Sequence, residues 1–171
     1  MSISKNACKR LSIVAGVHRE EHQIIDHCNI LIEKYIQKIV SDVANIVIFS
    51  GKKTITVSDV KMLCVLSKYP QIVCPTNLDK LVNHCTNDED LQSRKDYPLY
   101  TLRKPFEDCV RSFLREFDLR IGKNVITLLQ TLTEHYIIVI MSRAKKIAEP
   151  RETLLLRDLK KAVILRDTCW I

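Results

Sequence analysis

The strongest constraint on the fold is a pair of long amphipathic segments, one in each half of the chain. Apolar residues recur at steps of three and four over residues 23–50, and again over residues 123–149. Such steps mark one face of an α-helix. The first helix would be about 42 Å long at a rise of 1.5 Å per residue, which is long for a globular domain. Each long helix therefore carries a broad apolar stripe that needs a partner.

Shorter helices flank each long one, so the order short–long–short occurs twice. They are predicted over residues 5–14, 57–69, 105–117 and 156–168, with Pro105 opening the third of them and Val14 and Leu66 facing inward. The only glycines, at positions 16, 51 and 122, fall at the predicted junctions between helices. The phrase GKKTITVSDVKML at 51–63 also returns in similar form as PRETLLLRDLKKA at 150–162. The chain is therefore an internal repeat.

One short–long–short unit cannot close a core, because two short helices cover only part of the long helix. A second unit laid antiparallel across the first would cover the remainder, and a tether between them would fix the pairing. The predicted fold class is all-α, with two tandem units paired within the chain. Residues 1–69 form the first unit and residues 102–171 the second. Residues 70–101 form a linker, with a short helix over 78–85.

Composition limits the function classes. The chain is 46% hydrophobic, which excludes disorder, and its formal charge of +7 favours an acidic partner such as nucleic acid, although an ordinary basic protein has the same charge. Seven cysteines without a C-x-x-C pair indicate reduced thiols in a reducing compartment. The N-terminal segment lacks a signal-peptide core, and no run of about 18 apolar residues indicates a membrane span. Neither secretion nor membrane binding is expected.

Basic residues border both long helices at matching separations. Arg19 and Lys52 bracket the first long helix and lie 33 residues apart, whereas Arg120 and Arg151 bracket the second and lie 31 apart. In an antiparallel pairing, each end of the molecule would present basic residues from both halves beside helix N-termini, which suits phosphate. Alone, each arginine would be read as a solvated surface residue, and Lys52 with Lys53 as a complement to a helix C-terminus.

Signs of enzymatic chemistry are weak. His18, Glu21 and His22 spell the H-x-x-E-H pattern of some zinc proteases, but here the pattern straddles a predicted loop and helix start and lacks a third ligand. No Gly-rich phosphate loop, catalytic triad or carboxylate pair emerges. We expect no enzymatic activity, no metal and no cofactor.

Both halves resemble core histones. The first half, in RLSIVAGVHREE and KKTITVSDV, resembles core histone four, and the second half resembles core histone three in RKPFEDCVR, in DLR at 118–120, in LLQTLTEHY at 128–136 and in the closing R-x-T-x-x-x-x-D. The fused order is similar to the viral histone doublets of giant viruses related to Marseillevirus. The resemblance implies two histone folds, each of short, long and short helices, that pair in an intramolecular antiparallel handshake.

The resemblance also implies residue roles. Arg19 and Arg120 match arginines that enter the DNA minor groove, and other basic or hydroxyl positions match phosphate contacts. The implied DNA-binding residues are Lys9, Arg10, Arg19, Lys52, Lys53, Thr54, Arg103, Lys104, Arg111, Arg120, Arg151 and Thr153. Lys52 with Asp59, and Arg151 with Asp158, match the pairs that clamp each second loop to the helix after it.

The implied function is sequence-nonspecific wrapping of double-stranded DNA in nucleosome-like particles that compact a viral genome. Implied partners are a second copy, joined through the histone-three-like half, and a doublet resembling the other two core histones. The implied location is the virion and the host nucleus or viral factory. The alternative is a histone-fold interaction module of a transcription-factor or chromatin assembly that does not wrap DNA. The acids in HREEH around Arg19 and the missing basic tails favour that alternative. Glu152 also replaces a typical second-loop residue, which weakens the expected grip on DNA.

Overall fold

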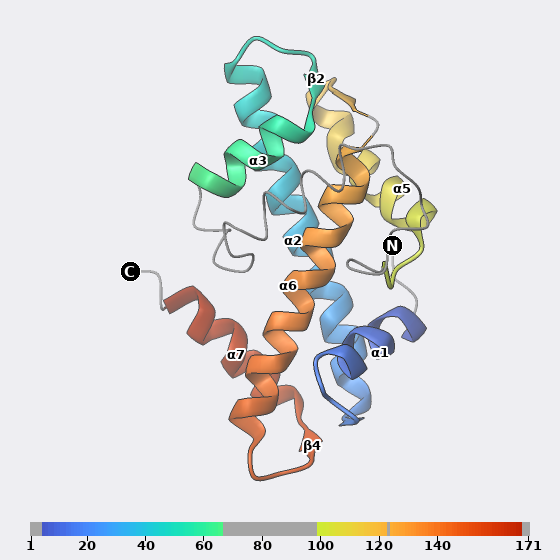
Figure 1. The fold of residues 1–171 in the computed structure, drawn as a ribbon, viewed down its shortest axis with the longest axis vertical. Helices are drawn as coiled ribbons and strands as arrows, with labels where there is room; N and C mark the ends of the chain where they lie inside the picture. Colours follow the sequence, from blue (N-terminus) through green and yellow to red (C-terminus); the bar gives the residue numbers. More distant parts are fainter. Residues whose placement is uncertain (1–4, 67–98, 123, 169–171) are drawn as a thin grey trace.

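The computed structural model describes residues 5–66, 99–122 and 124–168 (Figure 1). The described part is mostly helical, as predicted. Its helices are α1 (Lys5–Val14), α2 (His22–Phe49), α3 (Val57–Leu66), α5 (Arg103–Leu114), α6 (Val125–Ala148) and α7 (Leu156–Thr168), with a 3-10 turn η2 over Arg115–Phe117. Predicted and observed helices therefore agree closely in number and place over these residues.

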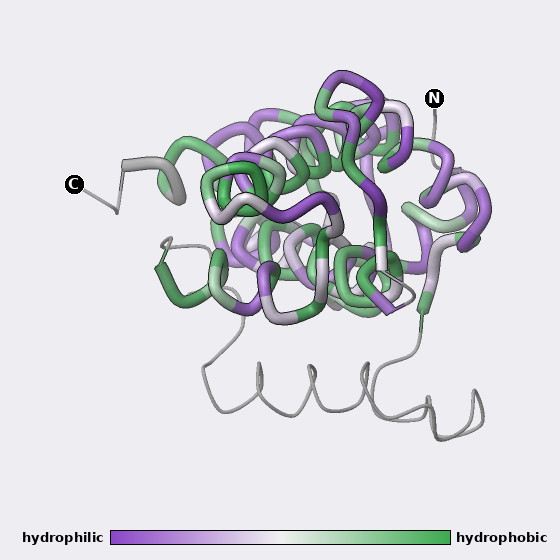
Figure 2. The backbone as a smooth tube through the Cα atoms, turned by 90° about the horizontal axis from the view of Figure 1, so that it is seen from above, coloured by the Kyte–Doolittle hydropathy of each residue, from purple (hydrophilic) through white to green (hydrophobic). Residues whose placement is uncertain are grey.

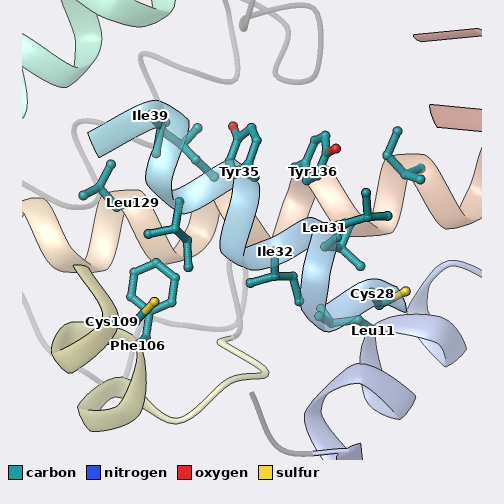
Figure 3. Packing of buried hydrophobic residues seen from close by; sticks show 14 of the residues in the cluster. Leu11, Cys28, Leu31, Ile32, Tyr35, Ile39, Phe106, Cys109, Leu129 and Tyr136 are labelled. Carbon is teal, nitrogen blue, oxygen red and sulfur yellow. The ribbon is translucent and has the colours of Figure 1, made fainter. Parts of the chain in front are cut away.

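The long helices α2 and α6 cross at the centre of the molecule and run in opposite directions (Figure 1). Their facing apolar stripes supply most of the core, because residues at helical spacing on both are almost fully buried. Tyr35 and Tyr136 stack where the helices cross, with ring centroids 4.2 Å apart and an interplanar angle of 6° (Figure 3). Both tyrosines thus belong to the core.

Short helices from each half pack against both long helices. α1 and α3, from the first half, contact α6 as well as α2, and α5 and α7, from the second half, contact α2 as well as α6. Figure 2, which views the molecule from above, shows polar and apolar residues alternating along the helices. The buried apolar residues of both halves form one continuous cluster, so within the described ranges neither half has a separate core.

The loops between helices pair in two short parallel ladders. β1 (Arg19–Glu20) pairs with β4 (Thr153–Leu154), and β2 (Thr54–Ile55) pairs with β3 (Arg120–Ile121). The labels of β2 and β4 mark opposite ends of the molecule in Figure 1. In each ladder, the loop before one long helix lies beside the loop after the other.

Three details differ from the sequence-based expectations. α5 begins at Arg103 and not at Pro105, so the proline sits within the first turn, where its missing N–H leaves no helical bond unmade. Val14 and Leu66 were predicted to face inward but are 46% and 72% exposed. Each is the last described residue of its helix.

The end of the predicted linker belongs to the packed structure. The Glu134 carboxylate on α6 accepts hydrogen bonds from the backbone N–H groups of Tyr100, at 3.0 Å, and Thr101, at 2.8 Å. Gln130 Nε2 donates to the carbonyl of Thr101 at 2.9 Å. Burial raises the pKa of Glu134 despite the hydrogen bonds that it accepts. Residues 67–98, including the predicted short helix over 78–85, lie outside the described residues.

The described cysteines are free thiols, as predicted. Cys8, Cys28, Cys64 and Cys109 are all buried and unpaired with one another. Burial raises the pKa of Cys8 and of Cys64 to about 11. Because the thiolate is the reactive form, these residues act as small apolar side chains. The other three cysteines lie outside the described residues.

One helix in the described part is long and apolar enough to cross a membrane. α6 meets that test by length and composition, but 67% of the relevant window is buried inside the structure. A central helix that other helices cover on most sides is apolar because its side chains form the core. We therefore assign α6 to the core of the protein.

Candidate nucleic-acid interface

Two exposed clusters combine loop residues from both halves. We call residues 19–21 with 151–153 the Arg19 loop pair, and residues 52–54 with 120–122 the Arg120 loop pair. Strand register places Arg19 opposite Thr153, and Thr54 opposite Arg120. All four residues are exposed. At each end, an arginine that precedes one long helix thus stands beside a threonine that follows the other.

A carboxylate holds the second loop in the same way at both ends. Lys52 Nζ lies 2.8 Å from Asp59 Oδ1, and an Arg151 guanidinium nitrogen lies 2.8 Å from Asp158 Oδ1. The other oxygen of each carboxylate accepts a backbone N–H just before the helix, from Thr56 at 2.8 Å and from Leu155 at 3.1 Å. Each aspartate thus caps a helix and holds a loop cation.

The same contacts set the acidity of both aspartates. Burial opposes ionisation of Asp59, but hydrogen bonds from Lys52 and Thr56 outweigh it and lower its pKa. Burial likewise opposes ionisation of Asp158, and the bonds from Arg151 and Leu155 again outweigh it, so its pKa is also lowered. Both carboxylates are therefore charged over the whole neutral range.

Acidic side chains occupy the Arg19 loop pair. An Arg19 guanidinium nitrogen lies 3.1 Å from Glu152 Oε2, and the two side chains are 72% and 81% exposed. Glu21 Oε2 accepts the backbone N–H of Leu156, the first residue of α7, at 2.9 Å. These contacts join the two halves and were not expected from the sequence. The sequence did show that Glu152 is unusual, because Lys53 stands at the matching position of the first copy of the repeat.

The Arg120 loop pair has a different composition. Arg120 and Lys53 are exposed, and among the described residues neither side chain has an acidic partner. The Arg120 backbone N–H donates to the Lys53 carbonyl at 2.9 Å, and that of Gly122 donates to Ile55 at 2.9 Å. A Cβ on Gly122 would lie 3.0 Å from the Ile55 oxygen, so the close approach of these loops favours glycine.

Two surface cavities flank Arg19. One, of about 340 Å³, lies toward the end of α6, and the other, of about 500 Å³, lies toward α1. Polar residues lining the first are His18, Arg19, Lys145, Glu149, Arg151 and Glu152. Those lining the second are Lys9, Ser12, His18, Arg19, Glu20, His22 and Thr153. Lys9 of the predicted set is thus brought beside Arg19 and Thr153.

The remaining predicted DNA contacts are exposed on the first short helices. Arg10 lies on α1, and Arg103, Lys104 and Arg111 lie on α5. Lys104 pairs with Asp108 at 3.0 Å, and Arg111 with Glu107 at 2.8 Å, both one helical turn away. Such exposed pairs contribute a few tenths of a kcal/mol, so they do not prevent either cation from reaching a phosphate.

The H-x-x-E-H pattern is divided by the start of α2. His22 is the first residue of that helix, His18 lies in the preceding loop, and the Glu21 carboxylate is bound to the N-terminus of α7. Within the described ranges, no group of three or more His, Cys, Asp or Glu side chains could hold a metal ion.

Solved structures with the same arrangement include the crystal structure of the histone from Methanopyrus kandleri. It aligns with a TM-score of 0.66 over 94% of this chain and 93% of that chain, at 17% sequence identity. This chain has the histone fold. Neither a protein-family model nor a curated protein sequence matches it. The histone fold is thus established by shape, and the roles of individual residues rest on the geometry of the two loop pairs.

Proposed function

We propose that this chain is a non-enzymatic histone doublet that binds DNA without reading its sequence. In this proposal two tandem histone folds pair in an intramolecular handshake, wrap DNA in nucleosome-like particles and compact a viral genome. The observation that carries the proposal is the repetition of one loop geometry at both ends of the molecule. Each loop pair sets an exposed arginine beside an exposed threonine from the other half, above a clamped cation.

The chemistry of the loop pairs suits the DNA backbone. Arginine inserted into a minor groove that faces the protein, together with hydroxyl and backbone contacts to the adjacent phosphates, binds DNA without base-specific bonds. The ladders fix the backbone at Arg19 and Arg120, so the two side chains extend from rigid backbone positions. Arg10, Lys104 and Arg111 on the first short helices would add phosphate contacts.

Exposed apolar residues support further assembly. Phe49, Met62 and Val65 lie at the end of α2 and on α3, and Phe49 is 96% exposed. They are the proposed contact for a doublet resembling the other two core histones. Ile164 and Leu165 on α7 are about half exposed, and the end of α6 with α7 is the proposed contact for a second copy. The proposed location is the virion and the host nucleus or viral factory.

A second candidate function is favoured by the acids of the Arg19 loop pair. If Glu21 and Glu152 serve only to join the two halves, the chain could be a histone-fold interaction module that assembles proteins without wrapping DNA. The two functions differ in how DNA affinity depends on salt and on the loop arginines.

Affinity measured against salt concentration tests the proposal. For duplexes of unrelated sequence, we expect equal affinities that fall with salt by a logarithmic slope of about 0.9 for each phosphate contacted. Replacing both Arg19 and Arg120 with glutamine should make the slope shallower by up to about two. A matched control replaces Lys34 and Lys38, exposed on the middle of α2, with glutamine. Absent binding at low salt, or equal slopes for both double variants, would contradict the proposal.

A further inference from the structure

The two loop pairs share the same ladder and the same clamp, so their side chains can be compared position by position. Lys52, Lys53 and Thr54 correspond to Arg151, Glu152 and Thr153, 99 residues later. Arg19 corresponds to Arg120, and Glu21 corresponds to Gly122. The backbone N–H of Glu21 donates to the carbonyl of Leu154, and the backbone N–H of Gly122 donates to the carbonyl of Ile55 in the same way. The clamps are also the same. The two ends thus share a ladder and a clamp, and their loop pairs differ in the side chains that they carry.

Those side chains give the two loop pairs opposite formal charges. The Arg120 loop pair contains three cations, Lys52, Lys53 and Arg120, and no acid, for a charge of +3. The Arg19 loop pair contains two cations, Arg19 and Arg151, and three acids, for a charge of −1. The acids are Glu20, Glu21 and Glu152. Phosphate is therefore attracted to one end much more strongly than to the other.

Specific contacts reinforce this difference. Glu152 Oε2 lies 3.1 Å from a guanidinium nitrogen of Arg19, so a phosphate that binds Arg19 has to displace this carboxylate. Glu21 occupies the first N–H of α7 at 2.9 Å, and helix N-termini are natural sites for anions. At the other end, Lys53 replaces Glu152, and Gly122 has no side chain in the place of Glu21. Both features that phosphate would use at the Arg19 end are thus already bound.

We propose that the two loop pairs bind DNA unequally, with the Arg120 loop pair as the main phosphate site and Glu152 restraining Arg19. This inference rests on the proposed DNA-binding function. An exposed ion pair adds little to folding stability, so the main effect of Glu152 is on the affinity of Arg19 for an anion. DNA would engage the Arg120 end first, and the Arg19 end would follow as salt falls.

A double-mutant cycle tests the restraint on Arg19. Glu152→Gln should raise the affinity for duplex DNA roughly fivefold at 0.1 M salt and steepen the salt slope by about 0.9, equivalent to one more phosphate contact. In an Arg19→Gln background the same change should have less than about a twofold effect, because the restrained partner is gone. Glu149→Gln is the matched control, since Glu149 is exposed beside the same cavity and pairs with no cation among the described residues.

The inequality of the two ends is tested by the single arginine variants. Arg120→Gln should reduce affinity at least about threefold more than Arg19→Gln, and melting followed by circular dichroism should show that all variants remain folded. Equal losses from the two arginines, or equal gains from Glu152→Gln and Glu149→Gln, would overturn the inference while DNA binding itself stands. A wild-type chain that binds no duplex at low salt would instead overturn the proposed function, and this inference with it.

Discussion

At the scale of single residues, Asp59 and Asp158 connect local structure to the loop pairs. Each carboxylate is almost fully buried, yet it accepts bonds from a helix N-terminus and from a loop cation. The cation is thereby held at the base of an exposed arginine–threonine pair. Stability and the presentation of the loops should therefore depend on the same two carboxylates.

Replacing either aspartate with asparagine should lower the free energy of unfolding at pH 7 by about 1–3 kcal/mol, because a charged, buried set of hydrogen bonds is lost. Since the pKa of each folded carboxyl is lowered, its contribution is complete above the unfolded value of about 3.9 and is lost as pH falls through the folded pKa. Urea unfolding of the wild type and the variants, at pH 7 and below pH 4, measures this difference in the free energy of unfolding. A wild-type advantage that does not shrink in acid, or an equal loss in the exposed control Asp26→Asn, would contradict the assignment.

The resemblance to core histones indicated the clamp pairs, but the sequence did not indicate the acids that join the halves. Lys52 with Asp59 and Arg151 with Asp158 were named because they match clamp pairs of core histones, and each pair lies within one loop and the helix after it. Glu21 and Glu152 act on residues more than 130 positions away, and no local pattern indicates such a partner. The contrast between Lys53 and Glu152 in the two repeats was visible, but its consequence depended on knowing that Arg19 lies beside it.

At the scale of elements, the crossing of α2 and α6 organises the fold. Stacked tyrosines at the crossing join the two halves at the centre of the core (Figure 3). Aromatic side chains at such a position contribute through buried area and through ring contact. Loss of either ring should therefore lower the stability of the fold.

Tyr136→Ala should lower the free energy of unfolding by about 3–5 kcal/mol, because it removes a buried ring and leaves a cavity. Tyr136→Phe keeps the stacked ring and should cost roughly 1 kcal/mol. Chemical denaturation of both variants measures the difference. If the alanine variant lost no more stability than the phenylalanine variant, the stack would not hold the two long helices together.

The elements were largely predictable because helical periodicity and the three glycines fix where each helix runs. The failures occurred where tertiary contacts decide. Val14 and Leu66 match the apolar period but are exposed, because the period does not indicate which residues another helix covers. Thr101 looked like linker, but it is buried because Glu134 and Gln130 bind it across about 30 residues of sequence, a contact that composition does not encode.

At the scale of the whole molecule, the two loop pairs lie at opposite ends of a single core (Figure 1). A duplex bound to both must therefore run along the length of the protein. Because each pair takes residues from both halves, neither half alone could present a complete pair. The proposed wrapping function thus depends on the tandem chain as a unit.

Nuclease protection tests that function most directly. The chain would be assembled with DNA of unrelated sequences by salt dialysis, alone and with a doublet resembling the other two core histones, and then digested. We predict discrete protected lengths that are independent of sequence and are lost when both Arg19 and Arg120 are replaced with alanine. A smear, or no protection by folded protein with or without the partner, would contradict wrapping and favour the interaction-module function.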